Sequence, residues 1–236
     1  MAVLSFARRA LSRGAVLLAV IGVVGCGGAD AAETTGGTVP LFGGTVPDGR
    51  PAIDLSPSSD RDTGRDVVVI GDSITVASAP QIEAAAEELD VDVTVLGEVG
   101  RRITVGRQPA AGTDVLAEVL AEGDPDLVVV ALGTNDIGKY TTIAEYAGQI
   151  DELVGMLPED QPLVWINTYL ENTPDASATF NAALLETLTD RGTATIGRWS
   201  SIAQRDGMLS DGIHPSDQGT EEFADLVLTE IENWLG

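Results

Sequence analysis

The stretch Asp66-Val67-Val68-Val69-Ile70-Gly71-Asp72-Ser73 is a short apolar run that stops at a glycine and two polar residues. A continuous run of β-branched residues is typical of a strand buried on both faces, as strands are in parallel sheets. The polar residues stand where such a strand turns toward a helix. The stretch therefore predicts a fold built on a buried parallel sheet, with polar side chains at the end of its first strand.

The same alternation of apolar runs and amphipathic stretches continues to the end of the chain. Strands are predicted at 66–70, 91–96, 127–132, 163–167 and 193–199, and helices at about 80–89, 113–122, 142–157, 175–190 and 216–235. This alternation predicts right-handed crossovers and a three-layer α/β/α sandwich with a five-stranded, mainly parallel, flavodoxin-like sheet. Ligands bind to sheets of this kind beyond the carboxyl ends of the strands.

Three short motifs lie where that rule expects a site. Gly71-Asp72-Ser73 follows the first predicted strand, Gly133-Thr134-Asn135-Asp136 follows the third, and Asp211-Gly212-Ile213-His214 precedes the last helix. A serine nucleophile needs a base, and His214 is the only histidine, with Asp211 close enough to orient its ring. The amide of Asn135 can donate a hydrogen bond to a developing oxyanion.

Each motif alone also fits a purely structural role. Gly-Asp-Ser is what a strand-to-helix turn with a capping serine looks like, and both Asp-Gly and Gly-Thr-Asn-Asp fit ordinary turns. The three motifs occur in a fixed order, and each stands at the edge of the sheet where a site should form. Their joint occurrence is therefore a stronger signal of catalysis than any one of them.

Together the three motifs resemble those of the SGNH/GDSL hydrolase family, and the resemblance covers the whole predicted domain at 65–236. It implies that Ser73 is the nucleophile, His214 the general base and then acid, and Asp211 the residue that orients the histidine. It also implies an oxyanion hole made by the backbone N–H groups of Ser73 and Gly100 and the side chain of Asn135. The segment before Gly100 lacks the polar residue common in the family, and Gly100 equally fits a plain turn.

The resemblance implies a serine esterase that hydrolyses or transfers short acyl groups through an acyl-enzyme, with no metal or cofactor. Segments 99–101 and 164–169, together with Trp199, are similar to SGNH domains of cell-envelope O-acyltransferases, although Trp165 and Trp199 equally fit packing roles. A cell-envelope polysaccharide O-acetyltransferase is therefore an alternative. A non-catalytic glycan-binding lipoprotein is the rival from another class, and it predicts an incomplete triad.

The chain is strongly acidic, with a formal net charge of -24 at pH 7. Such a surface repels nucleic acid and anionic lipid, so neither is expected as an electrostatic partner, and the charge also fits a simple role in solubility. We expect a monomer whose substrate is a small acyl ester or an acylated glycan.

The N-terminus has the pattern of an export signal. Residues 1–25 combine three arginines with an apolar run shorter than the roughly 20 residues that span a bilayer. The run ends at Cys26, the only cysteine, in a context similar to the lipobox of bacterial lipoproteins. We expect a lipid on Cys26, a Gly-, Pro-, Thr- and Ser-rich tether at 26–64, and location at the outer face of the membrane. A plain secretory signal or an uncleaved anchor is the alternative.

Overall fold

The computed structural model describes residues 65–236, which form a five-stranded parallel sheet between two layers of helices. The strand order is β2-β1-β3-β4-β5. The strands are β1 (Arg65–Gly71), β2 (Val91–Gly97), β3 (Leu127–Ala131), β4 (Leu163–Ile166) and β5 (Ala194–Gly197). All four strand pairs are parallel, which confirms the predicted α/β/α fold. The predicted signal peptide, Cys26 and the tether lie outside the described residues.

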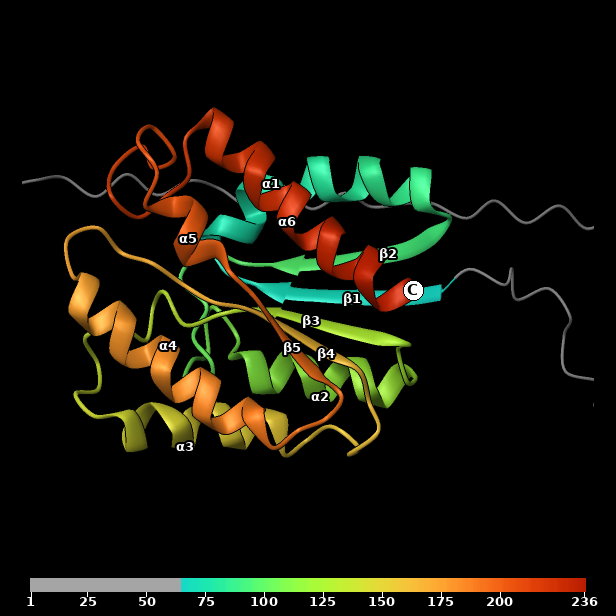
Figure 1. Ribbon diagram of the computed structural model, residues 1–236. Coiled ribbons are helices and arrows are strands. Elements are labelled where there is room, and N and C mark those ends of the chain that lie inside the picture. Colours follow the sequence, from blue (N-terminus) through green and yellow to red (C-terminus); the bar gives the residue numbers. More distant parts are fainter. Residues whose placement is uncertain (1–64) are drawn as a thin grey trace, which may run out of the picture. The chain divides into compact units, whose positions relative to one another are not determined.

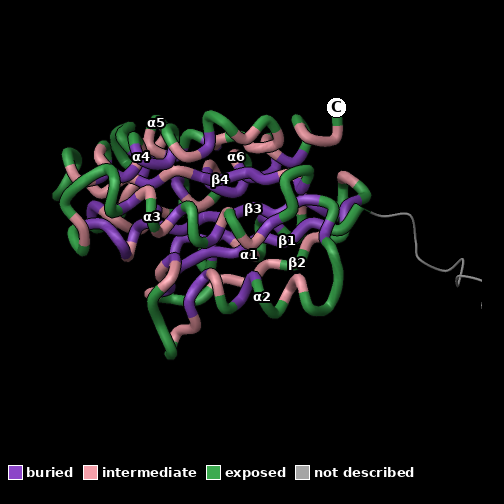
Figure 2. Tube along the Cα trace, turned by 90° about the horizontal axis from the view of Figure 1, so that it is seen from below, coloured by how far each residue is buried: buried purple, intermediate pink, exposed green. Residues whose placement is uncertain are grey.

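The apolar run that suggested a buried strand supplies both cores of the domain. Val68 and Ile70 of β1 pack in the cluster on one face of the sheet, and Val67 and Val69 pack in the cluster on the other. Successive side chains of a strand point to opposite faces, so a strand covered on both sides has to be apolar at every position. Figure 2 shows these buried strands as a layer in the middle of the molecule.

The helices divide between the two faces of the sheet (Figure 1). Residues of α1 (Ser73–Ala86), α5 (Trp199–Ala203) and α6 (Asp217–Leu235) pack against one face. Residues of α2 (Gly112–Glu122), α3 (Ile143–Val154) and α4 (Pro174–Thr189) pack against the other. None of the helices in this part of the chain is long and apolar enough to cross a membrane.

Two predicted boundaries were wrong. The first helix was expected near residue 80 but begins at Ser73, because the carboxylate of Asp72 accepts a hydrogen bond from the backbone N–H of Ile74 and caps the helix there. The last strand was expected to continue to Trp199, but that residue begins the short helix α5. Trp165 and Trp199 are both buried, in agreement with packing roles.

The strand order reverses direction between β1 and β3. The chain passes from β1 outward to β2, then returns across β1 to β3 and continues to β4 and β5. The loops that leave β1 and β3 therefore diverge to opposite faces of the sheet, which leaves a crevice at their carboxyl ends. Gly71-Asp72-Ser73 and Gly133-Thr134-Asn135-Asp136 are the two segments at this crevice.

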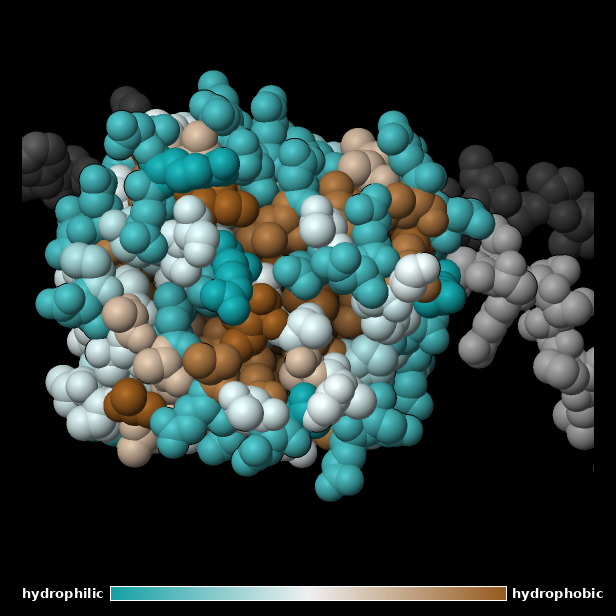
Figure 3. All heavy atoms as spheres, in the orientation of Figure 1, coloured by the Kyte–Doolittle hydropathy of each residue, from teal (hydrophilic) through white to brown (hydrophobic). Residues whose placement is uncertain are grey.

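Figure 3 shows hydrophobic residues gathered on the face over β5, between α4 and α6. A groove of about 980 Å³ runs there, lined by residues of α4, β5 and α5 such as Leu185 and Ile196. Its lining includes neither Ser73 nor His214. This groove is thus separate from the predicted catalytic residues.

Gly133 is held in a conformation that favours glycine, with φ at +129°, and a Cβ there would lie 2.3 Å from the ring of Phe180. We expect Gly133→Ala to lower the free energy of unfolding by roughly 1–3 kcal/mol, because the ring has to shift within a packed core. Urea denaturation measures this change. Gly148→Ala, at an exposed helical position with open space, is the control and should leave stability unchanged or raise it by up to about 1 kcal/mol. Equal stability of the two variants would contradict the assigned packing.

Candidate active site

Three of the side chains singled out in the sequence form a continuous chain of hydrogen bonds. Ser73 Oγ lies 3.1 Å from His214 Nε2, and His214 Nδ1 lies 2.8 Å from Asp211 Oδ2. Ser73 and His214 are 141 residues apart in the sequence. The structure therefore brings the predicted nucleophile, base and orienting carboxylate together in the order that serine hydrolysis requires.

The loop before α6 gives the histidine its orientation. Asp211 Oδ1 accepts hydrogen bonds from the backbone N–H groups of Ile213 (3.0 Å) and His214 (2.8 Å). Gly212, which follows Asp211, has φ at +84°. The carbonyl of His214 accepts from the backbone N–H of Ser210 at 2.8 Å. Backbone and side chain of His214 are thus held by the same short turn.

Hydrogen bonds to Asp211 also set its charge. The bond from the His214 side chain, together with those from the backbone N–H groups of His214 and Ile213, lowers the pKa of Asp211 to about 2. The carboxylate therefore remains ionised and acts only as an acceptor near neutral pH. An ionised acceptor at Nδ1 favours the histidine tautomer with its proton on Nδ1, which leaves Nε2 free to take the proton of Ser73.

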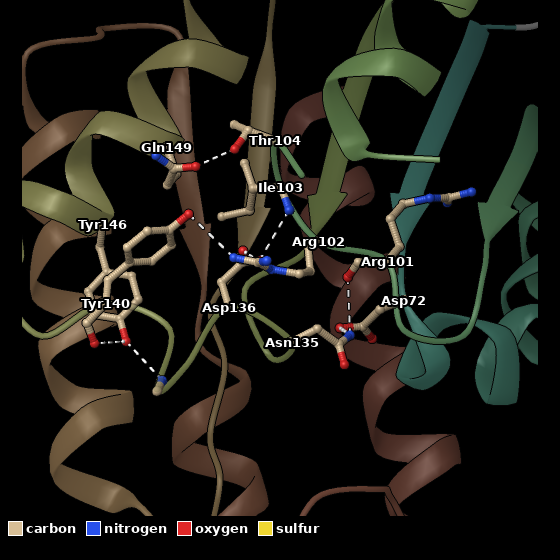
Figure 4. A network of polar contacts seen from close by, with 11 residues as sticks. Asp72, Arg101, Arg102, Ile103, Thr104, Asn135, Asp136, Tyr140, Tyr146 and Gln149 are labelled. Carbon is tan, nitrogen blue, oxygen red and sulfur yellow. Dashed lines mark hydrogen bonds and ion pairs between the residues drawn. The ribbon is translucent and has the colours of Figure 1, made fainter. Parts of the chain in front are cut away.

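Asn135 comes from the loop after β3 and lies next to Asp72, the residue before the predicted nucleophile Ser73. Its side-chain nitrogen donates to Asp72 Oδ2 at 3.2 Å and to the backbone carbonyl of Arg101 at 3.1 Å (Figure 4). Gly100, next to Arg101, has φ at +82°, and a Cβ there would meet no atom within 4 Å. The backbone conformation, rather than close packing, therefore requires this glycine. The loop after β2 and the loop after β3 meet at the Arg101 carbonyl.

The sequence singled out Arg101 only as the end of segment 99–101, but in the structure its side chain is buried and joins three segments of the chain. Its guanidinium donates to the carbonyls of Gly71 (3.0 Å), Ala110 (3.2 Å) and Leu96. An arginine in a glycine-containing loop is usually exposed, so no sequence pattern signalled this burial. Arg101 fixes the end of β1, and with it the backbone that leads to Ser73, against the loop after β2.

Asp136 performs a similar role for the loop after β3. Its buried carboxylate accepts from Arg102 Nε at 3.0 Å and from the backbone N–H of Ile103 at 3.1 Å, and Arg102 also contacts Tyr140 (Figure 4). Burial raises the pKa of Asp136, against the opposing effect of these two donors. The sequence singled out Asp136 only as part of a turn. In the structure it holds the two loops together.

A family model of the GDSL-like lipase/acylhydrolase family matches residues 69–221, which include all three motifs. The chain belongs to this family. No curated protein sequence matches this GDSL-family chain closely enough to count as a relative.

Several solved structures share the fold of this GDSL-family domain. The lipase/acylhydrolase from Enterococcus faecalis has a TM-score of 0.60 at 19% identity, and the match covers 72% of this chain and 96% of that one. The catalytic domain of peptidoglycan O-acetyltransferase A from Streptococcus pneumoniae has a TM-score of 0.57 at 18% identity, covering 72% and 94%. The psychrotrophic esterase from Pseudoalteromonas sp. has a TM-score of 0.58 at 17% identity, covering 72% and 97%. These structures share the α/β/α architecture with the GDSL-family chain.

We expect the effect of Asp72→Asn on stability to depend on pH. Burial raises the pKa of Asp72 to about 6, although the bond from the Ile74 N–H opposes the shift. The folded state therefore binds the proton of the Asp72 carboxyl more tightly than the unfolded state, in which this carboxyl titrates near pH 4. The cost of ionisation is absent below about pH 4, grows up to about pH 6 and is complete above it. Asparagine removes this cost and keeps a side-chain oxygen that can cap α1.

The gain in free energy of unfolding for Asp72→Asn should therefore be roughly 2–3 kcal/mol larger at pH 8 than at pH 4. Chemical denaturation of both proteins at the two pH values measures it. A gain or loss of the same size at both pH values would mean that the Asp72 carboxyl titrates alike in the folded and unfolded states.

Proposed function

We propose that this protein is a serine esterase that removes short acyl groups from ester substrates, with Ser73 as nucleophile, His214 as general base and acid, and Asp211 as the residue that orients the histidine. The observation that supports this most directly is the unbroken hydrogen-bond chain from Ser73 through His214 to Asp211. Membership in the GDSL-like family supports ester hydrolysis or acyl transfer as the reaction class.

The proposed reaction is a double displacement. His214 Nε2 takes the proton of Ser73 as Oγ attacks the acyl carbon, and the resulting imidazolium is stabilised by the ionised Asp211. His214 then donates the proton to the leaving alcohol, and the acyl group remains on Ser73. Water, deprotonated by the same histidine, attacks the acyl-enzyme and releases the acid.

The oxyanion formed in each step needs donors close to Ser73. We assign this role to the backbone N–H of Ser73, the backbone N–H of Gly100 and the side-chain amide of Asn135. Ser73 supports the assignment because it is the first residue of α1, where backbone N–H groups and the helix dipole favour negative charge. Asn135 supports it because its amide lies between Asp72 and the loop that carries Gly100.

The exposure of the triad favours a short acyl group on a large or polar carrier. The side chains of His214 and Asp211 are 45% and 56% exposed, and the spacious apolar groove along β5 does not include them in its lining. A long acyl chain would need apolar surface next to the nucleophile to leave water. An acylated glycan, or a small soluble ester, needs no such surface.

Transfer of an acyl group to a sugar hydroxyl is the second candidate reaction. It is favoured by the structural similarity to the catalytic domain of peptidoglycan O-acetyltransferase A. The same triad serves both reactions, because hydrolysis and transfer differ only in whether water or a sugar hydroxyl attacks the acyl-enzyme. We propose hydrolysis as the primary activity, because the exposed triad leaves the acyl-enzyme open to water.

We expect Ser73→Ala and His214→Ala to lower kcat for a short nitrophenyl ester by a similar factor of at least about 10⁴, because the members of a triad act as a unit. Asp211→Asn should lose less. Ser73→Ala should also abolish covalent labelling by a fluorophosphonate probe. Ser201→Ala, which removes an exposed serine of α5, is the control and should keep both turnover and labelling. Substantial turnover by either alanine variant of the triad would refute the assignment.

We also propose that the chain is exported and held at the outer face of the membrane by a lipid on Cys26. Residues 1–64 lie outside the described residues, so the support comes from the sequence: the arginine-rich start, the short apolar run and the single cysteine that follows it. More than one acyl chain would make such an anchor stable.

Cells that express the wild-type chain should incorporate a fatty acid analogue into the protein, and cells that express Cys26→Ser should not. The reason is that Cys26 supplies the only thiol of the chain. Gel fluorescence after metabolic labelling measures the incorporation, with Ser73→Ala as the control that should remain labelled. Undiminished labelling of Cys26→Ser would exclude the lipid anchor at this residue.

A further inference from the structure

Asp72 is a fully buried carboxylate directly before the nucleophile, and none of the catalytic roles assigned above uses its side chain. Its two oxygens have different partners. Oδ1 accepts from the backbone N–H of Ile74 at 3.0 Å, and Oδ2 accepts from the side-chain amide of Asn135 at 3.2 Å. The first contact caps α1, and the second reaches across to the loop after β3.

Capping alone does not account for a carboxylate at this position. Asparagine and serine cap a helix about as well as aspartate, and neither has a charge that is costly to bury. Burial of Asp72 raises its pKa to about 6, so the ionised form is maintained against a desolvation cost. The contact that needs a carboxylate is the one in which Asp72 accepts from the Asn135 amide. A serine is too short to reach Asn135, and an asparagine that caps α1 through its oxygen would present a donor to Asn135.

An acceptor at this point determines which way the Asn135 amide faces. A side-chain amide has a donor end and an acceptor end that are nearly equal in shape, so its neighbours decide between two orientations. The ionised carboxylate of Asp72 only accepts, and the backbone carbonyl of Arg101 only accepts as well. Both require the NH₂ group of Asn135 on their side, as Figure 4 shows.

The two N–H groups of the Asn135 side chain differ in whether a substrate can reach them. Asp72 is fully buried behind the nucleophile, so a substrate that enters from solvent does not displace the bond to its carboxylate. The second N–H, directed at the Arg101 carbonyl in the loop with the partly exposed Gly100, is the one that can turn to an acyl oxygen.

We propose that Asp72 is a positioning residue that acts through Asn135: its carboxylate fixes the amide with the NH₂ group toward the site, so that one N–H meets the oxyanion. The inference rests on the proposed function, because it needs Asn135 to serve in the oxyanion hole. Asp72 itself does not touch the substrate.

The variant Asp72→Asn tests this directly. The new side chain keeps an oxygen for the Ile74 N–H but turns an NH₂ group toward Asn135. If the Asn135 amide turns, its oxygen accepts from the new NH₂ group but faces the Arg101 carbonyl, and if it does not turn, two donors face each other. In both cases the N–H of the proposed oxyanion hole is no longer held in place. We expect kcat for a short nitrophenyl ester to fall by about 10²–10³-fold, with KM within about threefold of wild type. Cooperative unfolding of this variant, with the dependence of stability on pH predicted above, separates the effect from damage to the fold.

A double-mutant cycle then shows whether Asp72 acts through Asn135. Asn135→Ala should lower kcat by a similar factor, and adding Asp72→Asn to it should change kcat by less than about threefold, because the residue that Asp72 orients is gone. Thr142→Asn, which places an asparagine cap on α3 away from the site, is the control and should keep wild-type kcat.

Two results would overturn the inference: wild-type kcat in Asp72→Asn, or losses of Asp72→Asn and Asn135→Ala that multiply fully in the double variant. Failure of the proposed function is recognised separately, because it appears as retained turnover and labelling in Ser73→Ala. A Ser73-dependent enzyme with multiplying losses would therefore refute the role of Asp72 and leave the esterase assignment in place.

Discussion

The contact between Ser73 Oγ and His214 Nε2 depends on how α1 and α6 pack side by side on one face of the sheet. Ser73 begins α1, and His214 lies three residues before α6 begins, so each of the two proposed reacting groups lies at or just before the N-terminus of one of these helices. Both helices bury apolar side chains, such as Ile82 and Val227, against the same core. A shift of one helix along the other would separate serine and histidine, and the packing of this core therefore controls the distance on which the proposed chemistry depends.

The polar side of the site is fixed by buried charged groups. Arg101 holds the ends of β1 and β2, and Asp136 holds the loop after β3 against residues 102 and 103. Buried charges cost free energy unless they are fully hydrogen-bonded, and each of these groups has at least two partners. The sheet topology brings the loops after β1, β2 and β3 near one another, and these contacts join them into one support. The proposed donors of the oxyanion hole are thereby held in place before a substrate arrives.

The sequence predicted the parts of this arrangement that depend on local pattern. The Val-rich run at 67–70 indicated a strand buried on both faces, and the three motifs indicated Ser73, Asn135 and the Asp211–His214 turn. The start of α1 was missed because the chain has no apolar periodicity there and the helix begins at a side-chain cap on Asp72. The buried role of Arg101 was missed because its partners are backbone carbonyls from distant segments, and such partners leave no pattern in a sequence. Contacts of this kind are decided by tertiary structure alone.

Asp72 and Asp211 show how one residue type can perform two tasks at one site. Asp211 is exposed and accepts three hydrogen bonds, which lower its pKa to about 2, so it remains a negative partner for an imidazolium. Asp72 is fully buried, and desolvation raises its pKa to about 6. Opposite pKa shifts in these two carboxyls indicate different roles, because the environment and not the side chain sets the charge. In the proposed mechanism, the charge that Asp211 holds at little cost stabilises the protonated His214. The charge that Asp72 holds at a cost to stability is then best explained by the orientation it imposes on Asn135.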